Sequence, residues 1–279
     1  MTTALLNPGA MGAAIGRELR AADPNREVLW VGAGRSPDTR ARAEAAGLTE
    51  VGSLADVVEA ADVVLSVCPP ANALDVARAV ADAGFSGRYV DANAVSPTTA
   101  REVAELFDDA VDGGIVGPPP SQSGTTRLYV SGATASSVAE LFAGSNLEVR
   151  LVDGGAGAAS AVKMCFAGWT KGTTAVLLAI RALAQAEGVE DALLDEWATS
   201  MPELVTRSEA APAAVGPKAW RFEPELQEIA ASMMAVGLPG GFHQAGADIY
   251  ERMAGFKGRP DAGDEAVVLA EVLDALLSR

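Results

Sequence analysis

The order of apolar and helical segments in the first half of the chain constrains the fold most strongly. Short runs rich in β-branched residues alternate there with amphipathic stretches of helical periodicity. Strands and helices that alternate at this spacing form a parallel sheet with helices on both faces. The predicted strands are 4–6, 28–31, 62–67, 89–91, 110–115, 128–131 and 147–152, and the predicted helices are 11–22, 38–46, 53–60, 71–83 and 97–107. The sequence therefore predicts an α/β fold with a doubly wound sheet over residues 1–153.

The second half of the chain has a different pattern of apolar residues. After the glycine cluster 154–157 every periodic segment is helical, and no strand pattern follows. The predicted helices are 158–187, 191–200, 214–236, 241–255 and 264–277. We expect a helical substrate and dimerisation domain over 154–279, beginning with a long interdomain helix. Residues 173–186 are apolar around most of the helix, which indicates burial within the domain or against a partner subunit.

Composition excludes several classes of function. The formal charge of −16 argues against nucleic acid and anionic membranes as partners, although a local basic pocket can still bind an anionic substrate. Two cysteines exclude a disulfide framework, and two cysteines with one histidine argue against a His/Cys zinc site, so no metal is expected. No apolar run reaches the roughly 18–20 residues that span a bilayer, and the N-terminus lacks a signal-peptide pattern. We expect a cytoplasmic protein.

A glycine-rich turn joins the first predicted strand to the first helix. Its residues, Asn7-Pro8-Gly9-Ala10-Met11-Gly12, match G-x-G-x-x-G with asparagine in place of the first glycine. Asn7 tolerates a left-handed turn, Gly9 lets a pyrophosphate approach the backbone, and Gly12 lets the helix pack on the sheet. The helix N-terminus favours an anion. This context predicts a Rossmann-type dinucleotide site, and an ordinary glycine-rich turn is the alternative.

Basic and hydroxyl side chains follow the second predicted strand. Folds that prefer NAD carry an acidic residue there for the ribose 2′-hydroxyl, whereas this chain has Arg35 and Ser36. A guanidinium and a hydroxyl bind a 2′-phosphate through charge-assisted hydrogen bonds. The segment favours NADP(H) as cofactor, and a solvated basic loop is the alternative.

Two further strands end in candidate site residues. Val67-Cys68-Pro69 and Asn93 follow predicted strands at the carboxyl edge, where doubly wound sheets bind ligands. Cys68 is expected to pack beside the cofactor, because nothing nearby lowers its pKa. Asn93 is a candidate to bridge nicotinamide and substrate, or else it forms a turn before the helix that Ser96 caps.

Lys163 lies about two turns into the long helix, with small apolar neighbours that leave room for a ligand. A lysine there either extends to solvent or is held in a cleft, where burial prepares it for proton transfer. The residues alone leave both readings open.

Together these segments resemble the β-hydroxyacid dehydrogenase superfamily, which includes 3-hydroxyisobutyrate and 6-phosphogluconate dehydrogenases. The similar segments are 9–12, 35–36, 67–69, 91–93 with Pro97, 112–118, and 155–157 followed by Lys163. The resemblance implies Lys163 as general acid and base, and Asn93 as the residue that orients the lysine or the substrate oxygen. It also implies a homodimer with the long helix buried between subunits.

The chain departs from the family pattern where the family holds the substrate carboxylate. The family's Ser-Gly-Gly becomes Val116-Gly117-Pro118. The C-terminal half is similar to a bacterial subgroup with a distinct helical domain, and Trp220, Arg221 and His243 are its substrate-pocket candidates. Each has a plainer reading, respectively as a core residue, a surface pair and a helix histidine with its polar atoms satisfied.

The sequence therefore predicts an NADP(H)-dependent oxidoreductase that moves a hydride between nicotinamide and a small hydroxy or carbonyl substrate. Three alternatives remain: an NADPH-dependent imine reductase, a dinucleotide-binding protein without turnover, and a phosphosugar dehydrogenase. The substrate itself is not identified.

Overall fold

The computed structural model describes residues 1–260 and 262–278, which form two compact units, Met1–Met164 and Cys165–Arg279. The predicted boundary lies at residue 153, whereas the two units divide inside the long helix. The difference has a physical cause, because the first turns of that helix are hydrogen-bonded to the sheet of the first unit.

Within the described residues of the first unit, eight strands form one sheet in the order β3-β2-β1-β4-β5-β6-β7-β8. Strands β1 to β6 are parallel, while β7 runs antiparallel to β6 and parallel to β8. The strands are β1 Thr3–Leu6, β2 Val28–Val31, β3 Thr49–Val51, β4 Val63–Ser66, β5 Arg88–Asp91, β6 Ala110–Val116, β7 Thr126–Ser131 and β8 Leu147–Leu151. All seven predicted strands are present. Strand β3 was not predicted, because two of its three residues are exposed and no apolar run marks it.

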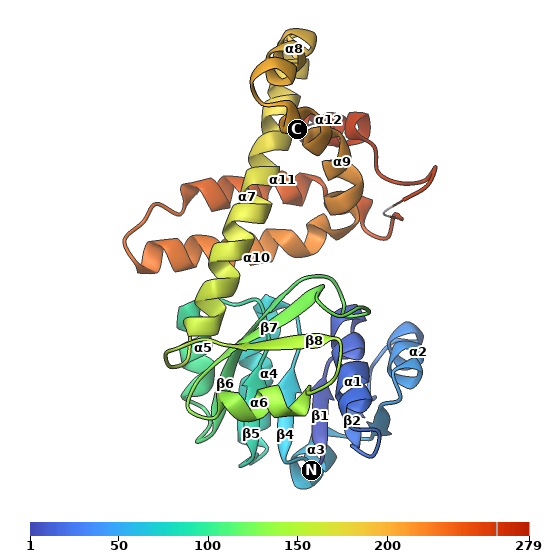
Figure 1. Cartoon of the computed structure of the whole chain (residues 1–279), viewed down its shortest axis with the longest axis vertical. Coiled ribbons are helices and arrows are strands. Elements are labelled where there is room, and N and C mark those ends of the chain that lie inside the picture. Colours follow the sequence, from blue (N-terminus) through green and yellow to red (C-terminus); the bar gives the residue numbers. More distant parts are fainter. Residues whose placement is uncertain (261, 279) are drawn as a thin grey trace. The chain divides into compact units, whose positions relative to one another are not determined.

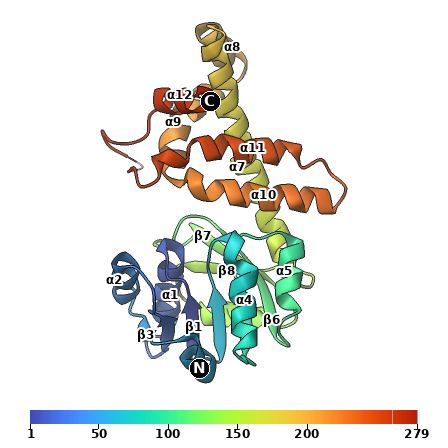
Figure 2. The ribbon, with the colours of Figure 1, turned by 180° about the vertical axis from the view of Figure 1, so that it is seen from behind.

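Helices cover both faces of this sheet, as the two opposite views show (Figures 1 and 2). One apolar core lies beneath α1, α2 and α6, and a second lies beneath α3, α4 and α5. The helices are α1 Ala10–Ala22, α2 Pro37–Ala45, α3 Leu54–Ala60, the 3₁₀ turn η1 Pro70–Asn72, α4 Ala73–Asp82, α5 Pro97–Ala104 and α6 Ala135–Leu141. The doubly wound α/β fold is confirmed. Among the α-helices of this unit, only α6, with seven residues, was not predicted from the helical period.

Serine side chains cap the starts of helices α2 and α5. The Ser96 hydroxyl accepts a hydrogen bond from the Thr99 amide at 3.1 Å, and Pro97 occupies the first helical position of α5. Ser36 caps α2 in the same way, with Pro37 behind it. Proline suits this position because its missing N–H would have had no helical partner. The predicted capping role of Ser96 is therefore confirmed.

All regular elements among the described residues of the second unit are helices. Its elements are the later part of α7 Ala158–Ala186, α8 Glu190–Ser200, α9 Pro202–Val215, η2 Gly216–Lys218, α10 Ala219–Ala235, α11 Gly241–Arg252, η3 Ala254–Phe256 and α12 Leu269–Leu277. The predicted helix 214–236 was wrong at its start, because Gly216 and Pro217 separate α9 from α10. The last helix begins at Leu269 and not at residue 264. Among the described helices, none combines the length and the apolar character needed to cross a membrane.

Candidate functional site

The candidate site of the first unit lies along one row of paired residues that crosses the sheet. Strand pairing places Leu6 beside Ser66, Ser66 beside Asp91, and Asp91 beside Asp112, from β1 through β4 and β5 to β6. These four strands are parallel, so the chain leaves each of them at the same carboxyl edge. The segments that follow the row include Asn7–Gly12, Val67–Pro69 and Asn93. The sheet therefore brings these predicted site segments to one edge.

The glycine-rich turn has the geometry of a phosphate-binding loop. Asn7 adopts φ 63°, the left-handed conformation expected of it. A Cβ on Gly12 would lie 2.6 Å from the Asn7 carbonyl oxygen, so only glycine lets α1 start this close to β1. At Gly9 a Cβ would meet no described atom within 4 Å, and Gly9 and Ala10 are exposed while Met11 is half-buried. No side chain of the described residues caps α1, so its first N–H groups can hold a phosphate.

Arg35 lies beside this turn. It follows β2 and is exposed, and its guanidinium donates to the Asn7 side-chain oxygen. Ser36 is also exposed, with its hydroxyl facing the start of α2. The neighbouring acid, Glu50, forms an ion pair with Arg40. Positive and hydroxyl groups thus stand at the tip of β2, where a ribose 2′-phosphate would lie.

Asn93 lies inside a buried polar network and is only 2% exposed. Its side-chain nitrogen donates to Asp91 and, at 3.1 Å, to the Ser66 hydroxyl. Its oxygen accepts from the Cys68 amide at 2.5 Å. Both amide hydrogens are therefore used within the protein, and Asn93 ties the turn Val67–Pro69 to the end of β5. Val67 and Cys68 are half-buried, and Pro69 is exposed at the edge.

Burial governs the titration of this network. It raises the pKa of Asp91 to about 7; hydrogen bonds from Asn93 oppose the rise, and the Asp112 carboxylate adds to it. The other Asp91 oxygen, Oδ2, has no hydrogen-bond partner among the described residues. Burial also raises the pKa of the Cys68 thiol to about 11, against a hydrogen bond with Ser66. A thiol with this pKa is protonated at neutral pH, which agrees with a packing role for Cys68.

Lys163 lies on the second turn of α7 and belongs to the first unit. A Cβ on Gly114 of β6 would lie 2.8 Å from the Lys163 Cβ, so the lysine stem rests on the strand backbone there. Gly114 is two residues beyond Asp112, as Asn93 is two residues beyond Asp91. Because Asp91 and Asp112 are paired, Lys163 lies over β6 two residues beyond the row that joins Ser66, Asp91 and Asp112. The lysine is half-buried.

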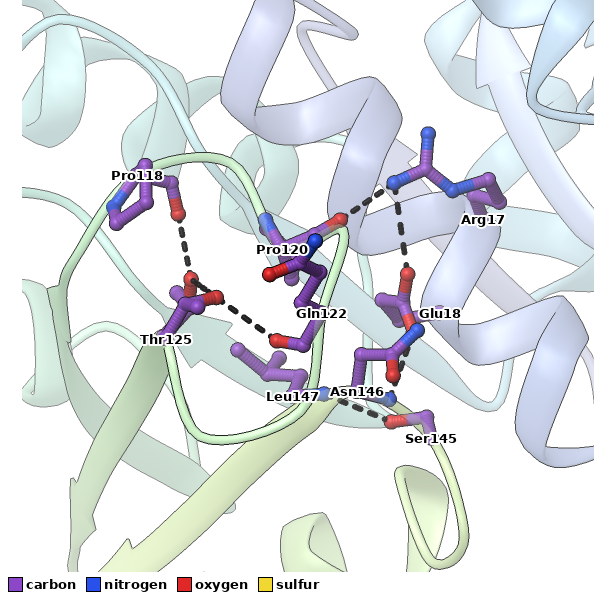
Figure 3. Close-up of polar contacts among 10 residues, drawn as sticks. Arg17, Glu18, Pro118, Pro120, Gln122, Thr125, Ser145, Asn146 and Leu147 are labelled. Atoms are coloured by element: carbon purple, nitrogen blue, oxygen red, sulfur yellow. Dashed lines mark hydrogen bonds and ion pairs between the residues drawn. The ribbon is translucent and has the colours of Figure 1, made fainter.

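The loop from β6 to β7 is fastened to α1. Gly117 adopts φ 123°, and the Pro118 carbonyl accepts from the Thr126 hydroxyl at 2.6 Å. Figure 3 shows Arg17 of α1 reaching the Pro120 carbonyl. Gly117 and Pro118 are exposed. The segment that replaces the family's Ser-Gly-Gly is therefore a proline-rich loop whose backbone is held at both ends.

The remaining predicted residues lie in the second unit. Trp220 is 40% exposed, and the Lys257 ammonium nitrogen lies 4.0 Å from its ring centroid. Arg221 is exposed, with its guanidinium carbon 5.8 Å from the Phe222 ring centroid. The His243 Nε2 atom lies 3.3 Å from the Gly168 carbonyl oxygen, where α11 packs on α7. The other ring nitrogen, Nδ1, is buried without a hydrogen-bond partner among the described residues, so only one of the two ring nitrogens is satisfied. A substrate contact by any of the three residues stays a prediction.

Two family models match separate parts of the chain. Residues 2–94 match the model described as NADP oxidoreductase coenzyme F420-dependent, and residues 184–253 match a domain of unknown function, DUF1932. An uncharacterized 28.5 kDa protein of Methanothermus fervidus is 30% identical over 171 residues. That match covers 61% of this chain and 66% of the relative, just under two thirds of its length.

Solved structures of this fold extend over nearly the whole chain. A conserved protein whose structure is described as similar to 3-hydroxyacid dehydrogenases is 27% identical, with a TM-score of 0.68. The alignment covers 92% of this chain and 98% of that one. The chain is therefore similar in fold to the 3-hydroxyacid dehydrogenases over nearly its whole length.

More distant structures share the β-hydroxyacid dehydrogenase fold. Mycobacterium tuberculosis 3-hydroxyisobutyrate dehydrogenase, determined with L-serine, is 23% identical over 99% of both chains, with a TM-score of 0.70. A reductive aminase from Aspergillus terreus in complex with NADPH and ethyl levulinate is 17% identical over 98% of both chains, with a TM-score of 0.56. At these identities the likeness is one of fold.

Asp91 and Asp112 match motifs of the β-hydroxyacid dehydrogenase superfamily, but their pattern in the sequence assigned them no role. Asp91 ends β5 behind the buried Tyr89 and Val90, Asp112 lies in β6 among glycine and apolar residues, and both are 3% exposed. A buried carboxylate needs hydrogen-bond donors, so an acid inside an apolar run is the signal that points to such a network. The donors come from segments distant in sequence, which the pattern alone does not reveal. Among the described residues, no cluster of three or more His, Cys, Asp or Glu side chains is suited to a metal ion.

Proposed function

We propose that the protein is an NADP(H)-dependent oxidoreductase that moves a hydride between nicotinamide and a small hydroxy or carbonyl substrate. The observation that carries the proposal is the alignment of the glycine-rich turn, Asn93 and Lys163 at one edge of the sheet. The family model for residues 2–94 and the NADPH complex of the reductive aminase support the choice of cofactor. The turn at Gly9 would hold the pyrophosphate, and Arg35 with Ser36 would hold the 2′-phosphate.

Lys163 supplies the proton chemistry in this proposal. Bound NADP+ accepts a hydride at C4 and bound NADPH donates it. In the oxidative direction the Lys163 amine takes the hydroxyl proton as the carbon loses hydride and the C=O bond forms. In the reductive direction the ammonium returns that proton to the carbonyl oxygen. Asn93 acts as a positioning residue, because it holds the turn at Cys68 beside the cofactor edge.

Affinity labelling tests the place of Lys163 without knowledge of the substrate. Periodate cleaves the nicotinamide ribose of NADP+ to a dialdehyde and leaves the 2′-phosphorylated adenosine ribose intact. A lysine that reaches this aldehyde is alkylated in the presence of cyanoborohydride. We expect mass spectrometry to find the label on Lys163, with Lys171, Lys218 and Lys257, the other three lysines, as internal controls. NADPH in excess should block it, and a label only on the other lysines would contradict the proposal.

A substrate panel separates this function from its alternatives. Short β-hydroxyacids are offered with NADP+, and cyclic imines with NADPH, while NADPH absorbance is followed. Turnover of β-hydroxyacids supports the proposal. Reduction of imines alone favours the imine reductase, a reading that the altered segment Gly117-Pro118 and the fold of the reductive aminase support. Nucleotide binding without turnover of either class favours a dinucleotide-binding protein.

We also propose that the protein is a homodimer through α7. One face of this helix, which we call the α7 stripe, carries apolar residues that lie three, four or seven positions apart, as at helix–helix contacts. Its members are apolar and exposed in the single chain: Phe166 49%, Trp169 70%, Val176 52%, Ile180 39% and Leu183 56%. An apolar cavity between α7 and α11 adjoins it, lined in part by Val176 and Phe242. We take a second copy of this chain as the partner that covers the α7 stripe, because so much exposed apolar surface is unusual on a monomer of charge −16.

Charges placed in the α7 stripe should dissociate the dimer. The double substitution Val176→Glu and Ile180→Glu buries two carboxylates in the proposed interface, and we expect a monomer in light-scattering chromatography at micromolar concentration. Leu151→Glu is the matched control, because Leu151 is also exposed, at 58%, but lies on β8. A monomeric wild-type protein, or a dimer that survives the double substitution, would contradict the proposed interface.

A further inference from the structure

Asp112 of β6 caps the N-terminus of α7 from the sheet. Within the described part of the chain, the carboxylate accepts four hydrogen bonds and is 3% exposed. Its Oδ2 accepts from the amides of Gly157 at 2.9 Å and Ser160 at 3.0 Å, and from the Ser131 hydroxyl at 3.1 Å. Its Oδ1 accepts from the Ser160 hydroxyl at 2.6 Å. Helix N-termini leave N–H groups without helical partners and favour negative charge, and Asp112 meets both needs.

The next turn of α7 rests on the same strand face. Side chains two residues apart in a strand point to the same side, so Gly114 lies on the face that carries Asp112. A Cβ at Gly114 would lie 2.9 Å from the Ala159 carbonyl oxygen and 2.8 Å from the Lys163 Cβ. Asp112 therefore binds the turn of α7 at Ser160, and the following turn, at Lys163, packs against Gly114.

We propose that Asp112 is a positioning residue that fixes the first turn of α7 and, through it, the place of the Lys163 amine relative to the bound nicotinamide cofactor. This inference rests on the proposed function. Ser131 of β7 also accepts from the Ala159 amide at 3.0 Å, but Asp112 accepts from both Gly157 and Ser160, so its loss frees most of the first turn to shift. A displacement of about 1 Å at a reacting group is enough to cost on the order of a hundredfold in rate.

The charge of Asp112, and not only its shape, is needed for the anchor. An asparagine at this position can keep its oxygen toward the amides of Gly157 and Ser160 and turn its amide nitrogen toward the Ser160 hydroxyl, but it carries no charge to meet the helix N-terminus. The charge-assisted hydrogen bonds from the two amides are then replaced by weaker neutral ones. Asp112→Asn thus removes the charge with little change in volume and weakens the helix start.

The labelling assay with periodate-oxidised NADP+ tests the inference. At saturating reagent, we expect Asp112→Asn to slow the modification of Lys163 by about tenfold or more, while the affinity for NADPH stays within about threefold of wild type. Hydrogen exchange should rise in residues 155–164 and stay unchanged in β1 and β4. Val138→Ala is the control: Val138 is fully buried on α6 in the same unit, and its truncation loosens packing without touching the anchor. It should leave the labelling rate at the wild-type value.

Ser160→Ala provides a milder variant if Asp112→Asn does not fold. It removes the hydroxyl that donates to Asp112 and keeps the backbone bond, so the labelling of Lys163 should slow in the same direction by a smaller factor. Wild-type labelling of Lys163 in both folded variants would overturn the positioning role and leave the proposed function intact. Absence of the label from Lys163 in the wild-type protein would contradict the proposed function and this inference together.

Discussion

Replacement of Lys163 by methionine is expected to lower turnover by about 10²–10⁴-fold, which is the usual contribution of a positioned proton donor and acceptor. Methionine keeps most of the side-chain length, and its first carbon still rests on Gly114, but the amine is lost. The glycine-rich turn at Gly9 is untouched, so the dissociation constant for NADPH should remain near the wild-type value. Steady-state turnover with the best substrate of the panel, together with a fluorescence titration of NADPH, measures both quantities.

Lys257→Met is the matched control for this experiment. Lys257 is exposed in the second unit, where its ammonium lies over the Trp220 ring, and its loss removes the same charge. Turnover should not change in the control. Full turnover in Lys163→Met would remove Lys163 from the proton chemistry. Unchanged turnover at saturation with much weaker NADPH binding would instead assign Lys163 to the cofactor.

Most of the fold of the first unit could be predicted from signals within a few neighbouring residues. The glycine-rich turn is specified by the strand before it, by the left-handed conformation of Asn7 and by the glycine at position 12. Steric contacts between residues close in sequence determine these features. The caps at Ser36 and Ser96 are local in the same sense. Parallel pairing then brings the strand ends to one edge whatever the intervening helices contain. The Rossmann-type fold and the segments that follow its strands could therefore be predicted from the sequence.

Contacts between distant segments could not be predicted in this way. The donors to Asp112 come from β7 and from the start of α7, 19 to 48 residues away. Two partners of the Asn93 side chain, Ser66 and Cys68, lie at the end of β4 or just after it, so the sequence did not reveal that its amide is fully used inside the protein. Helix α9, Pro202–Val215, was not predicted, because its apolar side chains are not concentrated on one face. The predicted start at residue 214 lies in the last turn of α9, before the 3₁₀ turn Gly216–Lys218 that precedes α10.

Removal of the Arg35 guanidinium is expected to weaken NADP+ binding by about 1.5–3 kcal/mol, the value of a charge-assisted hydrogen bond, and to leave NAD+ binding unchanged. In affinity this is a loss of about ten- to a hundredfold. Arg35 already lies against the Asn7 side chain, so the guanidinium stands between the glycine-rich turn and the tip of β2. Only the 2′-phosphate distinguishes the two nucleotides at that tip. Calorimetric titrations of Arg35→Ala with NADP+ and with NAD+ measure the difference directly.

Arg78→Ala controls for the change in net charge, because Arg78 is an exposed arginine on α4, 57% accessible, in the same unit. A long-range effect of charge would weaken NADP+ binding in both variants and would fade as salt is added, since screening acts on distant charges. A direct contact with the 2′-phosphate predicts that only Arg35→Ala loses affinity and that the selectivity for NADP+ over NAD+ falls by the same factor. Equal weakening of both nucleotides in Arg35→Ala would place the guanidinium on the shared pyrophosphate, and the preference for NADP+ would then need another residue.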